Sequence, residues 1–178
     1  AEQLRWTDDT VRVTFEVGEP RAPASGLRAF VAALAASDAP MATLATPIEN
    51  VEELLNPHCV KVVRSAEGHA LYFSRAPLPW ARDAFAQTRE RLPADSAFLR
   101  HIGIYAYRAG FLRCFAKLTP TPLERAEPLE QLRPLEHCYR HALRLPRAPV
   151  PAGSPPPRPP PPLPPPPHRH PPPRSPSP

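Results

Sequence analysis

Cysteine, long apolar runs and C-terminal acidic residues are all scarce in this chain of 178 residues. The three cysteines, Cys59, Cys114 and Cys138, lack a metal-binding spacing such as Cys-x-x-Cys, and an odd, sparse set is typical of reduced thiols rather than of a disulfide framework. The longest apolar run covers residues 29–36, which is too short to cross a bilayer, and no signal-peptide pattern opens the chain. We therefore expect a cytoplasmic protein with no membrane partner.

Acidic residues are absent from the last part of the chain. Residues 1–136 carry 16 Lys and Arg against all 17 Asp and Glu, a net charge of −1, whereas residues 137–178 carry six arginines and no acid. A basic chain often binds nucleic acid, but here the formal net charge of +5 belongs to the C-terminal part. The basic and aromatic interleaving of RNA binders is also missing, so we expect no nucleic-acid partner.

Proline divides the chain into two regions. Of the 31 prolines, 16 lie within residues 154–178. Because proline has no N–H, this tail cannot form a ladder of backbone hydrogen bonds, and we expect it to be disordered or polyproline II. Arg158, Pro161 and Pro164 fit a loose SH3-ligand pattern, and residues 163–167 suit a polyproline-binding groove such as that of a WW domain. Low-complexity sequence matches such patterns by chance, so we favour a tail without a partner.

Strand and helix periodicities alternate in residues 1–153, which we expect to form one domain. Val11, Val13 and Phe15 alternate with polar residues, as in a strand, and residues 23–37 carry apolar residues at helical spacing. Further strands are expected at 41–46, 59–63, 70–73, 102–107 and 141–145, and helices at 51–55, 109–117 and 124–140. This alternation predicts an α/β layered fold with ligands at the carboxyl ends of strands.

Two prolines interrupt the expected helix at residues 124–140. An interior proline removes an amide donor and clashes with the preceding turn, at a cost of about 3 kcal/mol. With Pro128 and Pro134 both inside the segment, we expect this helix to be kinked or partly unformed.

Long strings of residues, in order, are the most specific feature of the chain. They are MATLATPI at 41–48, NPHCVKVV at 56–63, ALYFSRAPLPW at 70–80, FLRHIGIYAYRAGF at 98–111, PLE at 122–124 and LEQLR at 129–133. These strings resemble the 3-deoxy-manno-octulosonate (KDO) cytidylyltransferase family, over roughly residues 7–153 and over the central and C-terminal part of such enzymes. The resemblance implies a nucleotide-diphospho-sugar-transferase-like (Rossmann-like) α/β sheet, incomplete at the N-terminus, and a homodimer.

The resemblance also implies a reaction. In that family the anomeric hydroxyl of KDO attacks the α-phosphate of CTP and releases pyrophosphate, in support of lipopolysaccharide synthesis. Magnesium held by carboxylates neutralises the charge that develops. A relative that activates sialic acid is one alternative. A proline-rich interaction protein on a degenerate enzyme scaffold is another.

Five substrate-binding residues follow from the resemblance. Arg75 would bind the sugar carboxylate with its planar fork, although a surface arginine paired with a helix carboxylate has the same composition. Glu130 and Gln131, on one helix, would bind sugar hydroxyls; otherwise they form a solvated helix face. His101 and Tyr105, four residues apart on a strand, point to one face and could line a pocket, or they could be core residues with satisfied polar tips.

The chain departs from the family where metal and phosphate bind. Gly18 stands where the family has a magnesium-binding aspartate, and residues 151–153 lead into Ser154 instead of the second aspartate. The N-terminal segment that holds the CTP phosphates has no counterpart, and no other phosphate loop is present. We therefore expect no proper magnesium site and no catalysis by this chain.

Overall fold

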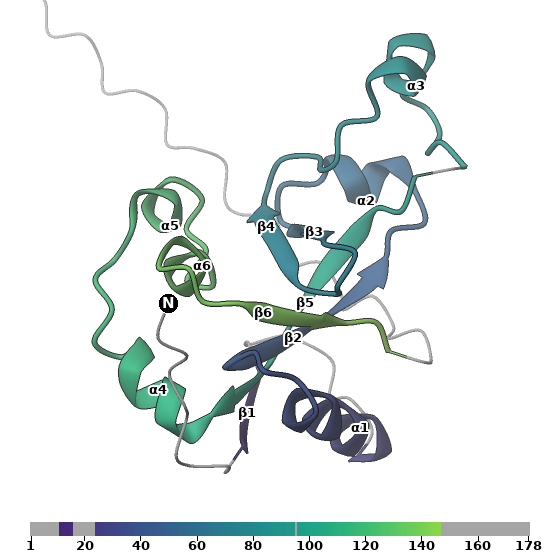
Figure 1. Cartoon of the computed structure of the whole chain (residues 1–178). Helices are drawn as coiled ribbons and strands as arrows, with labels where there is room; N and C mark the ends of the chain where they lie inside the picture. The colour runs from purple at the N-terminus through teal and green to yellow at the C-terminus, as the bar shows by residue number, and fades with distance from the viewer. Residues whose placement is uncertain (1–10, 16–23, 95, 147–178) are drawn as a thin grey trace, which may run out of the picture.

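A six-stranded mixed sheet lies at the centre of the computed structural model, which describes residues 11–15, 24–94 and 96–146 (Figure 1). The strand order is β4-β3-β5-β2-β6, and β1 also pairs with β5. The strands are β1 (Val11–Phe15), β2 (Met41–Pro47), β3 (Lys61–Arg64), β4 (Ala70–Ser74), β5 (Leu99–Arg108) and β6 (His141–Arg144). Only the β2–β6 pairing is parallel among these strands.

The longest strand, β5, organises the sheet. It pairs with β2 on one side, from Met41 opposite Tyr107 to Pro47 opposite Leu99. On the other side β1 pairs with its C-terminal half and β3 meets it only at Arg100. Nearly all of β5 is buried, which its alternating apolar and aromatic residues allow on both faces.

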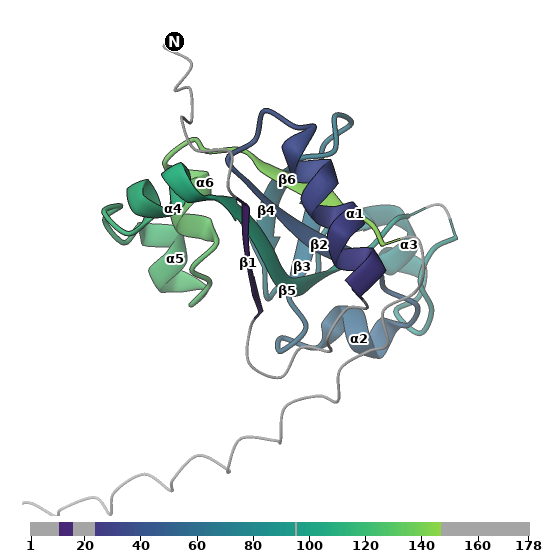
Figure 2. The same ribbon diagram turned by 90° about the horizontal axis from the view of Figure 1, so that it is seen from below.

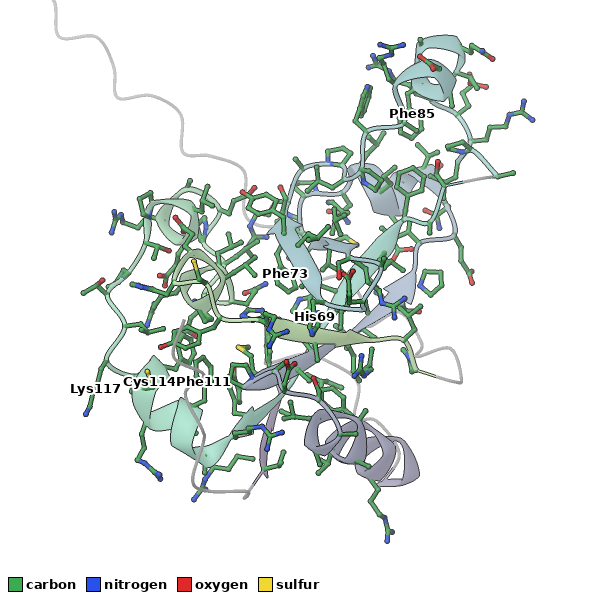
Figure 3. All side chains as sticks on the ribbon, viewed as in Figure 1. His69, Phe73, Phe85, Phe111, Cys114 and Lys117 are labelled. Carbon is green, nitrogen blue, oxygen red and sulfur yellow. The ribbon has the colours of Figure 1, made fainter. Side chains whose placement is uncertain are left out.

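The β3–β4 hairpin folds back over the sheet. Its turn needs Gly68, whose φ of 86° is the left-handed conformation that residues with a Cβ avoid. The Gly68 carbonyl accepts the N–H of Leu143, and His69 forms a bridge with Ala142, so the turn reaches β6. Phe73 is thereby fully buried in the core (Figure 3), which is worth about 1.5–3 kcal/mol.

Helices cover both faces of the sheet (Figure 2). Helix α1 (Ala24–Ala35) packs Phe30 and Leu34 on one face. On the other face α4 (Ala109–Phe115) packs Phe111 against Tyr105 and Tyr107. Helices α2 (Val51–Leu55) and α3 (Arg82–Gln87) share a separate cluster next to the start of β5. None of the helices in the described ranges has the length and apolar character to span a bilayer.

The helix expected at residues 124–140, kinked or partly unformed, is interrupted and forms two short helices. They are α5 (Pro122–Ala126) and α6 (Leu132–Glu136), joined by a turn. Pro128 follows Glu127, the C-cap residue of α5, and proline is common just after a helix C-cap. Pro134 is the third residue of α6, where an N–H would have no helical partner. The interruption was expected. Pro134 fits the first turn of α6, whereas Pro128 has a φ of 29°, far from the value of about −65° that the proline ring favours.

Several predictions concern residues that the structure does not describe. Gly18 lies outside the described ranges, and so does the proline-rich tail with its SH3-like pattern. The predicted division at residue 153 falls there as well. These statements stay predictions.

Candidate functional site

Arg75 directly follows β4, and backbone carbonyls hold its side chain. Its Nε donates to the carbonyl of Glu127 at 2.8 Å, its Nη1 to that of Pro57 at 3.1 Å and its Nη2 to that of Pro128 at 3.4 Å. A guanidinium has five N–H donors in a planar fork, and three are used here. Within the described part of the chain, these three bonds leave one N–H on each terminal nitrogen available to a carboxylate.

The carboxylate of Glu127 joins the end of β4 to the end of α5. Ser74 Oγ donates to its Oε1 at 2.5 Å, and the Arg75 backbone N–H donates to its Oε2 at 2.9 Å. Ser74 is buried, and its Oγ also accepts the N–H of Ala76 at 2.9 Å. We call Ser74, Arg75 and Glu127 the strand–turn clamp, because they connect β4 to the turn between α5 and α6.

The turn beyond the clamp carries Glu130 and Gln131, so the prediction that both lie on one helix is wrong. The physical reason is that α5 ends at Ala126 and α6 begins only at Leu132. Glu130 is well exposed, with 69% of its side chain accessible, whereas Gln131 is buried. Glu130 can thus contact a bound molecule as the structure stands.

An ion pair closes the same turn. Arg133 donates from Nε and Nη2 to the two carboxylate oxygens of Glu124, at 2.9 and 2.5 Å. This hydrogen-bonded pair lowers the pKa of Glu124 and raises that of Arg133. Glu124 Oε2 also accepts the N–H of Thr121 at the start of α5. Because the Glu124 carboxylate of α5 binds Arg133 of α6, it fixes the two helices on either side of the turn that carries Glu130.

His101 and Tyr105 point to the same face of β5, as predicted, with ring centroids 5.3 Å apart. Both are buried, at 6% exposure each. The His101 ring also packs edge-on against Phe73 at 5.0 Å, and Phe73 precedes Ser74 of the clamp. The two predicted residues therefore lie in the core beneath the clamp, which agrees with the alternative of core residues.

His101 is held as a neutral imidazole. The single hydroxyl proton of Thr43 has two carbonyl acceptors, Ile102 and Ile104, so Oγ1 accepts a hydrogen bond from His101, with Nε2 and Oγ1 2.8 Å apart. Burial lowers the pKa of His101 to about 3, and the nearby His141 contributes. The Nε2-protonated tautomer follows from these contacts, and the ring stays neutral near neutral pH.

Lys61 is a buried cation that sequence patterns did not single out. Its Nζ donates to the carbonyls of Asn56 and Cys59, at 2.8 and 2.5 Å, and burial lowers its pKa. Arg75 binds the carbonyl of Pro57 between them. Two cations thus organise the loop of residues 56–59 beside the clamp.

His141, also missed from the sequence, is fully buried on β6. Within the described part of the chain neither ring nitrogen has a hydrogen-bond partner, and burial lowers its pKa to about 3. Its ring lies 5.7 Å from that of Phe73. The sequence signal available was a histidine at a strand position expected to be apolar.

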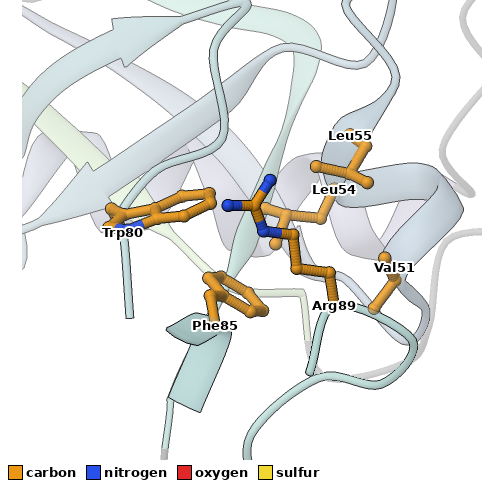
Figure 4. A pocket seen from close by; sticks show the side chains of 6 residues that line it. All are labelled: Val51, Leu54, Leu55, Trp80, Phe85 and Arg89. Atoms are coloured by element: carbon orange, nitrogen blue, oxygen red, sulfur yellow. The ribbon is translucent and has the colours of Figure 1, made fainter. Parts of the chain in front are cut away.

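A small surface pocket is lined by residues of α2 and α3 and by residues near them (Figure 4). It measures ≈ 10 Å³, which is room for about one water molecule. Its lining residues are Val51, Leu54, Leu55, Trp80, Phe85 and Arg89. The Arg89 guanidinium lies 5.3 Å from the centre of the Trp80 ring. The pocket is too small for a sugar or a nucleotide.

Metal-ligating side chains do not gather anywhere in residues 11–15, 24–94 and 96–146. No group of three or more His, Cys, Asp or Glu could hold an ion there. Octahedral magnesium prefers carboxylate oxygens, and the clamp carboxylate is already taken by Ser74 and Arg75. The described residues therefore do not fit a magnesium ion. All three cysteines are free thiols.

Comparison with known proteins gives a consistent result. A family model described as cytidylyltransferase matches residues 8–143. The chain is 54% identical over 148 residues to 3-deoxy-manno-octulosonate cytidylyltransferase of Xanthomonas euvesicatoria pv. vesicatoria, and 53% identical to that of Stenotrophomonas maltophilia. These matches cover 83% of the chain but only 57% and 58% of the relatives, so the chain spans little more than half their length.

Among solved structures, the fold is similar to that of CMP:2-keto-3-deoxy-manno-octonic acid synthetase complexed with CTP. The TM-score is 0.66 at 30% identity, over 76% of this chain and 52% of that one. The resemblance drawn from the sequence strings and the expected fold class are both confirmed.

Proposed function

Because the chain belongs to the cytidylyltransferase family, we propose that it carries the sugar-acid-binding half of an enzyme that activates KDO with CTP for lipopolysaccharide synthesis. The observation that supports this most directly is the state of Arg75. Three of its donors are fixed on backbone carbonyls, and one N–H remains on each terminal nitrogen. A side chain fixed in this way can bind a carboxylate with little loss of conformational freedom.

The proposal gives each of the five residues a role. Arg75 binds the carboxylate of the sugar acid, and Glu130 and Gln131 bind its hydroxyls from the neighbouring turn. Glu130 is exposed and can contact the ligand as the structure stands, whereas Gln131 is buried. His101 and Tyr105 belong to the core: the Tyr105 ring packs on His101, and His101 packs on Phe73, which precedes Ser74 of the clamp.

In the complete reaction the anomeric hydroxyl of KDO attacks the α-phosphate of CTP and pyrophosphate leaves. Both reactants are anions, so the reaction requires cationic groups to bring them together. Arg75 supplies one for the sugar, but the described residues supply no metal site, and Gly18 replaces the family's aspartate. We therefore propose that this chain binds KDO and forms no CMP-KDO.

We also propose a cytoplasmic location and a homodimer. Among the described residues no helix could span a bilayer, which is compatible with the first. The second follows from the family. Magnesium is proposed for complete members of the family and not for the described part of this chain.

Calorimetric titration with KDO tests the proposal. The parent chain should bind KDO, and Arg75→Lys should weaken binding about tenfold, because lysine keeps the charge but loses the bidentate fork. Arg82→Lys is the matched control, since Arg82 is 87% exposed and forms a salt bridge with its neighbour Asp83. Equal affinities for the parent and Arg75→Lys would remove the proposed role of Arg75.

A further inference from the structure

Glu127 receives an unusual concentration of hydrogen bonds from two consecutive residues. Ser74 Oγ and the Arg75 N–H bind its two carboxylate oxygens, and Arg75 Nε binds its carbonyl. The partners are 52 and 53 residues away along the chain. Both the side chain and the backbone of one residue thus hold Arg75 in place.

Tyr72 and Glu136 lie near the Glu127 carboxylate. Burial raises the pKa of Tyr72, and the negative charges of Glu127 and Glu136 raise it further. The carboxylate thus lies against the end of β4, where it accepts from positions 74 and 75. Charge-assisted hydrogen bonds of this kind are short and about twice as strong as neutral ones.

We propose that Glu127 is the positioning residue of the sugar-acid site, which orients the Arg75 fork and sets its distance from Glu130 and Gln131. This inference rests on the function proposed above. Glu127 contacts Arg75 directly and is followed by the turn that carries Glu130, so moving it displaces both halves of the site together.

Positioning and simple electrostatics predict opposite effects of removing Glu127. KDO is an anion, so loss of a nearby negative charge should by itself strengthen KDO binding. If Glu127 acts by orienting Arg75, its removal should weaken binding, because the fork loses the geometry that bidentate contact needs. The sign of the change in affinity separates the two explanations.

Three variants of the full chain make the test, with KDO affinity measured by calorimetry. Glu127→Ala should weaken binding about tenfold. Glu127→Gln should bind within about threefold of the parent, because its amide oxygen accepts the Arg75 N–H and its NH₂ donates to Ser74 Oγ. Glu136→Gln is the matched control. Glu136 accepts the N–H of Leu123 at 3.0 Å, so it links α6 to α5 through a hydrogen bond that does not involve Arg75.

An NMR measurement without ligand tests the role of Glu127 separately from the proposed KDO binding. The Arg75 Nε–H signal in ¹⁵N NMR should exchange with solvent faster in Glu127→Ala than in the parent or in Glu136→Gln. If the parent binds no KDO, the proposed function fails, while this exchange rate still decides whether Glu127 positions Arg75. If Glu127→Ala does not unfold cooperatively, Glu127→Asp replaces it, since the shorter side chain cannot reach both partners. Unchanged or tighter KDO binding with an unchanged exchange rate overturns the inference.

Discussion

Lowering the pH from 7 to 5 should destabilise the folded chain through His101 and His141. Both are buried, and burial lowers the pKa of each from 6.5 to about 3. In the unfolded chain an imidazole titrates near its ordinary pKa of about 6.5, so below that pH the unfolded state binds protons that the folded state does not. The stability is therefore complete above pH 6.5 and is lost progressively as the pH falls toward 3.

The size of this loss follows from the two pKa values. At pH values between the folded and the unfolded pKa, each histidine changes the free energy of unfolding by about 1.4 kcal/mol per pH unit. At pH 5 the loss is about 2 kcal/mol for one histidine and about 4 kcal/mol for both. Domains have a total stability of about 5–15 kcal/mol, so the effect is a large share of the whole.

The assay is urea unfolding at pH 7, 6 and 5, analysed by linear extrapolation. His141→Leu removes one titrating group and two buried nitrogens without partners in the described residues, so it should halve the loss between pH 7 and 5. His58→Gln is the control, because it removes an exposed histidine instead of a buried one. An unfolding free energy that is the same at pH 7 and pH 5 for the parent would refute the reasoning.

Two further predictions concern cysteines. Cys138 has a φ of 63°, so Cys138→Gly should raise the free energy of unfolding by about 1 kcal/mol, and a lower urea midpoint for that variant would contradict the assignment of strain. Burial and then the charge of Glu53 raise the pKa of Cys59 to about 11, so a maleimide at pH 7.5 should label the exposed Cys138 well before Cys59 in a mass-spectrometric time course. Equal labelling rates at the two cysteines would show that Cys59 is not protected.

The strands were predictable because their signal is local. The strand expected from Val11, Val13 and Phe15 appears as β1, and each of the other expected strands overlaps an observed one. Helix α3 was not expected, since it has six residues, one buried side chain, Phe85, and no side-chain cap. The contact between the β3–β4 turn and β6 could not be predicted either, because it depends on backbone groups at Gly68 and Leu143.

The candidate site was predictable only in part. The string ALYFSRAP identified Arg75, and LEQLR identified Glu130 and Gln131, but the placement of the latter pair on a helix was wrong. Glu127 was missed because its partners lie more than 50 residues away, and no local pattern marks a carboxylate that will bind a distant strand end. Burial of His101 and Tyr105 likewise depends on Phe73 and the hairpin that carries it.

A crystal structure of the chain with bound KDO is the most direct test of the sugar-acid site. The account predicts that the KDO carboxylate lies about 3 Å from both terminal nitrogens of Arg75, with sugar hydroxyls at Glu130 and Gln131. Arg75 should keep its contacts with the carbonyls of Glu127 and Pro57. A KDO carboxylate bound elsewhere, with the Arg75 fork unoccupied at saturating KDO, would contradict the central claim.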